Sequence, residues 1–255
     1  MKVVVLGAGI VGMTSALRIV EDCGTAGLDM TVMADKFSPN TTSDVAAGDP
    51  DWKDLVQGYR HPTKWELTNL FPGYKDGFFC TTFMLESKLF LPWATKRLKE
   101  AGAKFVERKV HSLDELYLDY DVIVNCTGIG ARDLVGDTKV VPSRGQIITV
   151  KAPWIKHRIE LTGNHPSIPG CPYVISGQSH TRIGGIRQHG RWDLSVDPRD
   201  TEKILDGVTT AFPSLKNVEI LNVKTGLRPM REEIRLEREE KKDNLSGKTV
   251  QVCTA

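Results

Sequence analysis

The clearest pattern of hydrophobic and polar positions lies in the first 35 residues of the chain. The run from Lys2 to Leu6 is dominated by valine, which is typical of a strand buried on both faces of a parallel sheet. Apolar positions from Ile10 to Glu21 recur near helical spacing, and Leu28 to Ala34 form a second apolar run. The pattern therefore predicts one βαβ unit at the start of the chain.

Later segments predict further elements, with a change of character near residue 146. We expect a helix over 89–101, a strand over 104–110, a short helical piece over 113–118 and a buried strand over 121–126. Beyond residue 146 the pattern predicts short strands bounded by glycine and proline turns, at 146–151, 173–176, 181–186, 219–225 and 234–238, and one helix over 201–212.

These elements together predict a mixed α/β fold, with a Rossmann-like nucleotide-binding domain and a second, largely antiparallel substrate domain. We assign residues 1–48 and 104–145 to the nucleotide-binding domain and residues 49–103 to a connecting segment. Residues 146–240 form the predicted substrate domain, and residues 241–255 begin a return to the first domain.

Composition and charge exclude several classes of function. The chain has 34 Lys and Arg against 32 Asp and Glu, and these charges are interspersed, so no basic stripe predicts nucleic-acid binding. Its apolar runs are far shorter than the roughly 20 residues that cross a bilayer. Five cysteines without paired spacing, and no Cys/His cluster, favour a reducing intracellular compartment and predict no metal site.

The strongest motif follows the first predicted strand. Gly7-Ala8-Gly9-Ile10-Val11-Gly12 is a complete GxGxxG sequence that opens the first predicted helix. Gly7 permits the tight turn, Gly9 lets the backbone approach a pyrophosphate, and Gly12 allows the helix to pack close to the strand. The helix N-terminus then offers N–H groups and partial positive charge to the phosphates.

A carboxylate stands where this motif requires one. Asp35 ends the second predicted strand, 23 residues after Gly12, where it can accept hydrogen bonds from ribose hydroxyls. The same charge would repel the 2′-phosphate of NADP, so the unit favours FAD or NAD and does not decide between them. For the glycine motif alone, a turn in an unrelated α/β protein is the alternative.

Several segments taken in chain order resemble the D-amino-acid oxidase family of flavoenzymes, and more closely its D-aspartate oxidase branch. The resemblance covers nearly the whole chain and rests on the glycine motif together with Thr41-Thr42-Ser43-Asp44-Val45-Ala46-Ala47-Gly48, Asn125-Cys126-Thr127-Gly128, Arg144-Gly145-Gln146, Gly184-Gly185-Ile186-Arg187-Gln188 and Gly226-Leu227-Arg228-Pro229.

The resemblance implies FAD as the cofactor and names the residues that hold it. The turn of Gly7, Ala8, Gly9, Ile10, Val11 and Gly12 would bind the pyrophosphate, and Asp35 with Lys36 would bind the adenosine ribose region. The flavin would lie against Thr41, Thr42, Ser43, Ala47 and Gly48, the adenine would meet Val110, and Thr127 would lie along the cofactor. Taken alone, the hydroxyl-rich stretch is equally consistent with a solvated loop.

The resemblance also implies a substrate site. Arg228 matches the arginine that clamps the substrate α-carboxylate, and Tyr173 matches the tyrosine whose hydroxyl shares that carboxylate. Arg187 matches a second arginine of the D-aspartate branch, where it would face an acidic side chain. Taken alone, each arginine would more simply make a surface ion pair, and the tyrosine would be a core aromatic.

The implied reaction is the oxidation of acidic D-amino acids, such as D-aspartate, D-glutamate or N-methyl-D-aspartate, by O2. It yields a 2-oxo acid, ammonia and hydrogen peroxide, and we assign no catalytic acid or base because the cofactor supplies the chemistry. Alternatives are an oxidase of neutral D-amino acids, a catalytically impaired short form that binds nucleotide weakly, and, last, an NAD-dependent dehydrogenase.

The chain departs from the family pattern in two places. Val45-Ala46-Ala47-Gly48 runs directly into Asp49, where the family carries an internal segment of several dozen residues. The sequence also ends at Ala255, before the segment that closes over the flavin and before a peroxisomal tripeptide. We therefore expect weakened FAD binding and exposed apolar surface, with a peroxisomal location implied by the family and a cytoplasmic one as the alternative.

Overall fold

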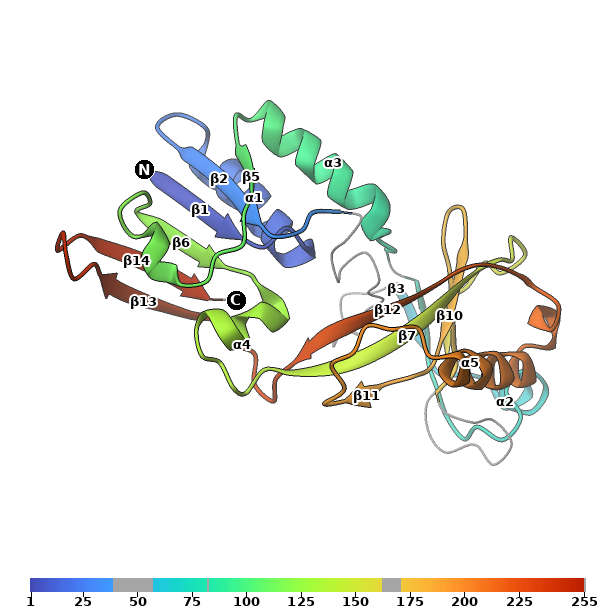
Figure 1. Cartoon of the computed structure of the whole chain (residues 1–255). Helices are drawn as coiled ribbons and strands as arrows, with labels where there is room; N and C mark the ends of the chain where they lie inside the picture. Colours follow the sequence, from blue (N-terminus) through green and yellow to red (C-terminus); the bar gives the residue numbers. More distant parts are fainter. Residues whose placement is uncertain (39–56, 82, 162–170, 255) are drawn as a thin grey trace.

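The computed structural model describes residues 1–38, 57–81, 83–161 and 171–254, which form two main sheets (Figure 1). The first sheet has the strand order β13-β14-β6-β1-β2-β5. Its strands are parallel except for β13, which pairs antiparallel with β14 at one edge. Their bounds are β1 (Lys2–Leu6), β2 (Asp29–Ala34), β5 (Lys104–Glu107), β6 (Val122–Asn125), β13 (Glu237–Lys242) and β14 (Thr249–Thr254).

Both faces of this sheet are covered, as the valine-rich first strand predicts. On one face, α1 (Ile10–Cys23) and α3 (Ser87–Glu100) pack against each other and against Val3 and Val5. On the opposite face, the 3-10 helix η3 (Leu113–Leu116) covers Val4 and Leu6. Since α3 belongs to the segment 49–103 that we expected to be a connection, part of that segment contributes to the core of the first layer.

The second sheet has the order β11-β7-β10-β9-β8, with β12 paired to β7. The strands β7 and β12 form a long antiparallel ribbon, paired from Lys151 and Glu219 at one end to Val141 and Met230 at the other, that links the two halves of the molecule (Figure 1). The bounds are β7 (Val141–Lys151), β8 (Ile159–Glu160), β9 (Tyr173–Ser176), β10 (Thr181–Gly184), β11 (Gln188–His189) and β12 (Glu219–Met230).

One face of this second sheet is closed by a helix. The helix α5 (Pro198–Ala211) begins after Asp197, whose side chain accepts a hydrogen bond from the Arg199 N–H, and it packs Ile204 and Val208 onto the sheet. On the opposite face, Ile147, Tyr173 and Ile175 form a smaller cluster of their own. The substrate residues predicted from the sequence therefore have to be sought on the face that α5 does not cover.

Smaller elements complete the described part of the chain. A two-stranded sheet joins β3 (Gln57–Arg60) to β4 (Phe79–Thr81), and the short helix α2 (Lys64–Asn69) begins at a capping box. Short helical turns are η4 (Gly128–Gly130), α4 (Ala131–Leu134) and η5 (Pro213–Leu215). Within the described ranges, no helix combines the length and hydropathy needed to span a membrane.

The mixed α/β fold class is confirmed, and the largest corrections concern the ends of strands. The strand predicted to begin at residue 146 begins at Val141, because Pro142 and Gly145 hide its first half from a pattern based on alternation. The strand predicted over 234–238 was wrong: Ile234 lies outside any strand and is almost fully exposed, and the strand β13 begins at Glu237. As a charged edge strand, β13 has no apolar alternation to reveal it.

Other boundaries shift by a few residues. The strand predicted over 104–110 ends at Glu107, and the one predicted over 181–186 ends at Gly184, where the chain turns at Gly185 with a φ of 150°. The strand predicted over 219–225 continues to Met230, and the helix predicted from residue 201 begins earlier, at Pro198. Apart from the strand predicted over 234–238, the predicted elements form, so the sequence pattern predicts their type better than their ends.

Candidate functional site

The glycine turn after β1 has the close contacts that its spacing predicts. A Cβ atom on Gly12 would lie 1.9 Å from the Gly7 carbonyl oxygen, and one on Gly7 would lie 2.5 Å from the Cys126 carbonyl oxygen. Gly7 also has a φ of +104°, a conformation that other residues rarely adopt. Gly9 precedes α1 in an extended conformation without a side-chain cap, so the N-terminus of α1 presents backbone rather than side chain at this edge.

The carboxyl ends of the neighbouring parallel strands bring other predicted residues to the same edge of the sheet. Asp35 and Lys36 follow β2 and are exposed, and Thr127 follows β6. The Thr127 hydroxyl donates a 2.7 Å hydrogen bond to the Asn125 side-chain oxygen. Val110 lies three residues beyond β5 and is partly buried against the core on the η3 face. Such an edge is where open α/β sheets bind nucleotides.

Asn125 is a residue at this edge to which the sequence reasoning gave no role. It is fully buried at the end of β6, and its side-chain Nδ2 has no hydrogen-bond partner among the described residues. A buried amide donor without a partner is costly, which suits a site that receives an acceptor atom. The neighbouring Cys126 thiol is also enclosed, and burial raises its pKa.

The remaining predicted cofactor residues, Thr41, Thr42, Ser43, Ala47 and Gly48, lie outside the described residues. Their proposed role beside the flavin therefore stays a prediction. Across residues 1–38, 57–81, 83–161 and 171–254, no group of three or more His, Cys, Asp or Glu side chains is arranged to hold a metal ion.

The side chains of two predicted substrate residues, Arg228 and Tyr173, pack against glycines in neighbouring strands of the second sheet. The Arg228 guanidinium lies so close to Gly145 that a Cβ atom there would be 2.3 Å from Nη1. In the same way, a Cβ atom on Gly184 would lie 2.3 Å from the Tyr173 hydroxyl. Gly145 and Gly184 are therefore the residues that allow these two side chains to lie flat across the sheet.

The Arg228 guanidinium has a hydrogen-bond donor that is not used within the described residues. Its Nη1 is buried and has no hydrogen-bond partner in the described part of the chain. A buried cationic donor in this state requires an acceptor, and a carboxylate satisfies a guanidinium better than other groups because it can accept two parallel bonds. The site around Arg228 is therefore suited chemically to an organic acid.

Tyr173 is 8% exposed, and burial raises the pKa of its hydroxyl. Arg228 opposes that shift, whereas Glu160 adds to it. The hydroxyl therefore keeps its proton to a higher pH than an exposed tyrosine does, and it can donate a hydrogen bond to an anion held by Arg228.

Arg187, the third predicted substrate residue, is engaged in an ion pair. Its Nη2 lies 2.9 Å from Glu160 Oε1, and the Arg158 Nη2 lies 2.9 Å from Glu160 Oε2. Glu160 is directly opposite Tyr173 in the β8–β9 pairing, which places this cluster next to the tyrosine. Glu160 and Arg158 had no part in the sequence prediction, because Glu160 meets Arg187 from 27 residues away along the chain.

On the α5 side of the sheet, Arg144 organises a polar network whose role the sequence did not reveal. Its guanidinium is fully buried and donates to Asp200 Oδ2 at 2.8 Å, to Gln188 Oε1 at 2.6 Å and to the Asp193 carbonyl at 2.9 Å. These bonds fix the segment before α5 against β7. The Arg144-Gly145-Gln146 motif was a signal for this position, but not for the scaffold role that its arginine has.

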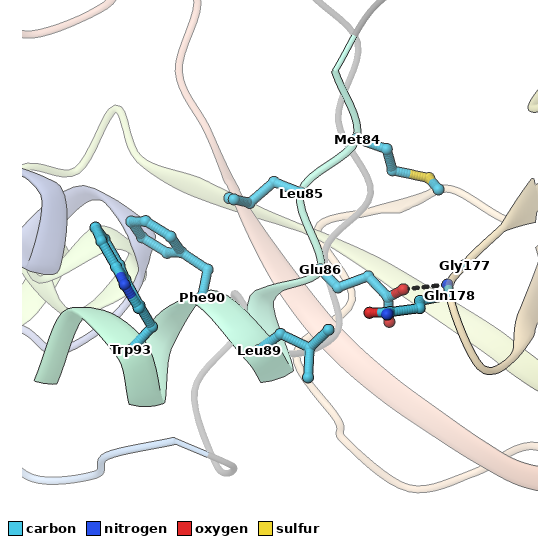
Figure 2. A pocket seen from close by; sticks show the side chains of 8 residues that line it. All are labelled: Met84, Leu85, Glu86, Leu89, Phe90, Trp93, Gly177 and Gln178. Carbon is cyan, nitrogen blue, oxygen red and sulfur yellow. Dashed lines mark hydrogen bonds between the residues drawn. The ribbon is translucent and has the colours of Figure 1, made fainter. Parts of the chain in front are cut away.

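One hollow in the described surface is separate from all of these residues. It has a volume of about 580 Å³ and lies where the start of α3 meets the turn after β9 (Figure 2). The Glu86 carboxylate accepts a hydrogen bond from the Gln178 N–H at its base, whereas most of its lining is apolar: Met84, Leu85, Leu89, Phe90 and Trp93. It contains none of the predicted cofactor or substrate residues.

Comparison with known proteins gives one consistent family. A family model described as an FAD dependent oxidoreductase (DAO) matches residues 50–246. D-aspartate oxidase of Homo sapiens is 33% identical, over 93% of this chain and 84% of its own. D-amino acid oxidase of Dugesia ryukyuensis is 28% identical, over 97% and 88%. The solved structure of glycine oxidase from Geobacillus kaustophilus superposes with a TM-score of 0.74 at 14% identity, over 99% and 88%.

The alignment with the human protein also bears on the expected internal gap. It extends over 297 positions, which is more than the 255 residues of this chain. Several dozen residues of that relative therefore have no counterpart here, as the sequence analysis predicts.

Proposed function

The chain belongs to the DAO family of FAD-dependent oxidoreductases, and we propose that it catalyses the oxidative deamination of acidic D-amino acids, D-aspartate in particular. One substrate molecule, O2 and water would yield the 2-oxo acid, ammonia and hydrogen peroxide. The observation that carries the proposal is the Arg228 guanidinium, whose buried Nη1 has no hydrogen-bond partner among the described residues and which lies on the same sheet face as Tyr173.

The residues at the edge of the first sheet fit FAD. Neither Gly7 nor Gly12 has room for a side chain, so the turn before α1 is tight, which suits the binding of a pyrophosphate at the helix N-terminus. The Asn125 amide, which has no partner among the described residues, suits an acceptor atom. We propose that Ala8, Gly9, Ile10 and Val11 hold the pyrophosphate and that Asp35 holds the ribose. When bound, FAD supplies the two-electron oxidation of the substrate and the transfer of those electrons to O2.

In this proposal Arg228 and Tyr173 fix the substrate α-carboxylate. The guanidinium contributes a bidentate, charge-assisted contact, and the protonated tyrosine hydroxyl donates one further hydrogen bond. Their joint effect is orientation: with the carboxylate held at two points, the α-carbon has a fixed position and the reacting bond a fixed direction. No acid or base of the protein is needed for this role.

Arg187 would supply the preference for an acidic side chain. A cation beside the substrate side chain attracts a second carboxylate and gives no such gain to D-alanine. The human relative named for D-aspartate supports this reading at moderate identity. The alternative, a preference for neutral D-amino acids, makes the opposite prediction for the same residue.

The test compares kcat/KM for D-aspartate and D-alanine in the FAD-reconstituted protein and in its Arg187→Leu variant. We expect the ratio to fall about tenfold or more in Arg187→Leu, which corresponds to about 1.4 kcal/mol of lost discrimination. Arg199→Leu is the control, because Arg199 lies on α5 with its side chain 84% exposed. An unchanged ratio in Arg187→Leu would refute the proposed role of this arginine.

A further inference from the structure

The ion-pair chain Arg158–Glu160–Arg187 borders the proposed substrate site, and two of its members, Arg158 and Glu160, have no role in the proposed function so far. The two oxygens of Glu160 are divided between two arginines, Oε1 to Arg187 and Oε2 to Arg158, each at 2.9 Å. One carboxylate thus pairs with two guanidinium groups. It therefore carries one excess positive charge.

The three members of this chain differ in how firmly they are held. The Glu160 side chain is 13% exposed and belongs to β8, whereas the Arg187 side chain is 62% exposed and lies beyond the end of β10. A largely buried carboxylate needs a cationic partner to stay ionised, and Glu160 has one in Arg158 that does not depend on Arg187. Arg187 is thus the member that can change partners at low cost.

The pairing of strands places this cluster beside Tyr173. Glu160 is directly opposite Tyr173 across β8 and β9, and side chains at directly opposite positions of an antiparallel pair lie on the same face of the sheet. Consistently, the Tyr173 hydroxyl is within electrostatic range of Arg158, Glu160, Arg187 and Arg228 together. One end of the site therefore has Arg228, whose Nη1 has no hydrogen-bond partner within the described ranges, and the other has Arg187, already paired with a carboxylate.

From this geometry we propose that Glu160 is a specificity-determining residue: it competes with the substrate side-chain carboxylate for Arg187, and Arg158 holds Glu160 when that carboxylate binds. The inference rests on the proposed function, since it concerns the substrate class of the same site. Glu160 then moderates the preference for acidic substrates, because a second carboxylate gains only the part of the Arg187 interaction that Glu160 gives up.

Two substitutions should move the preference in opposite directions. Glu160→Gln keeps the size of the side chain but removes the carboxylate that pairs with Arg187, so we expect KM for D-aspartate to fall about tenfold with little change in kcat or in KM for D-alanine. Arg158→Gln removes one of the two cations that pair with Glu160, which should strengthen its hold on Arg187, so KM for D-aspartate should rise several-fold. Glu219→Gln is the control, because Glu219 pairs with Lys151 at the solvent-exposed end of the β7–β12 ribbon.

Ligand binding provides a readout that does not depend on turnover. Titration calorimetry with malonate, a dicarboxylate, and with acetate should show a malonate-to-acetate affinity ratio that rises in Glu160→Gln and falls in Arg158→Gln. Glu160→Asp, which retains the charge, should restore most of the wild-type ratio and serves as a second variant if Glu160→Gln does not fold. Equal ratios in all four proteins, or parallel changes for both ligands, would overturn the inference.

The outcome also separates this inference from the proposed function. Wild-type protein that shows no preference for D-aspartate over D-alanine contradicts the proposed function itself. Wild-type protein that prefers D-aspartate, with the same preference in Glu160→Gln, contradicts only the role of Glu160.

Discussion

The substitution Gly145→Ala tests the proposed substrate clamp without removing any of its charged groups. A Cβ atom at this position would lie 2.3 Å from Arg228 Nη1, 2.6 Å from Nη2 and 2.8 Å from Cζ. Non-bonded carbon contacts are comfortable at about 3.5 Å, so the guanidinium must move by about 1 Å. The neighbour is the end of a side chain rather than backbone, and Gly145 is not among the glycines with positive φ, so the strand itself can accept alanine.

The size of the effect follows from hydrogen-bond geometry. A charged hydrogen bond near 2.9 Å that lengthens by about 1 Å is lost, and hydrogen bonds to charged groups are worth about 1.5–3 kcal/mol. Loss of one such bond, at about 2 kcal/mol, weakens substrate binding about 30-fold. We therefore expect a rise in KM for D-aspartate of this order, with a thermal midpoint close to that of the wild type.

The assay is steady-state oxygen consumption by FAD-reconstituted protein, with thermal unfolding followed by circular dichroism. Gly77→Ala is the matched control, because the nearest atom to its added Cβ would be Pro62 Cγ at 3.9 Å, which is ordinary contact. If Gly145→Ala has the KM of Gly77→Ala, Arg228 does not hold the substrate carboxylate, and the assignment of this site is wrong.

Two further predictions concern the glycine turn at the proposed FAD site and the stability of the protein at low pH. Gly12→Ala would place Cβ 1.9 Å from the Gly7 carbonyl oxygen, so it should destabilise the protein by about 2 kcal/mol or more and abolish FAD binding. Urea denaturation measures the loss of stability, and flavin fluorescence titration measures FAD binding. Unaltered FAD affinity would contradict the proposed role of the Gly7–Gly12 turn. Burial would raise the pKa of Asp137, but Arg231 and Arg235, at 3.3 Å each, outweigh it and lower the pKa below the ordinary value of 3.8. The folded state thus favours the ionised form, so this contribution to stability is complete above about pH 4 and is lost as the pH falls through the lowered pKa. In Asp137→Asn the free energy of unfolding should depend less on pH in that acid range. An unchanged pH profile would show that Asp137 is not a cause of this dependence.

The sequence could predict those parts of the fold and the site that depend on neighbouring residues. The turn Gly7–Gly12 and the strands on either side of α1 are local, because a fixed spacing of glycines and an apolar run are sufficient to define them. The resemblance to a known family then indicated Tyr173 and Arg228, two residues whose side chains occupy space left by glycines distant in the sequence. Neither glycine contact could be read from spacing alone.

Other features depend on contacts between distant segments and could not be predicted from the sequence. Glu160 and Arg187 are 27 residues apart and meet through the second sheet, and no local pattern pairs them. Arg144 is buried because Asp200, 56 residues away, compensates its charge, whereas an isolated arginine would be expected at the surface. The edge strand β13 is held by backbone pairing with β14, so its charged sequence carries no strand signal.

The proposed function requires that this chain bind FAD and pass electrons to it from an acidic D-amino acid. The decisive measurement is the visible absorption spectrum of the purified chain with added FAD, recorded without oxygen before and after D-aspartate and, separately, D-alanine. We predict protein-bound flavin bands that bleach with D-aspartate at concentrations where D-alanine has little effect. Absence of bound flavin, or equal bleaching by both amino acids, would contradict the proposed function.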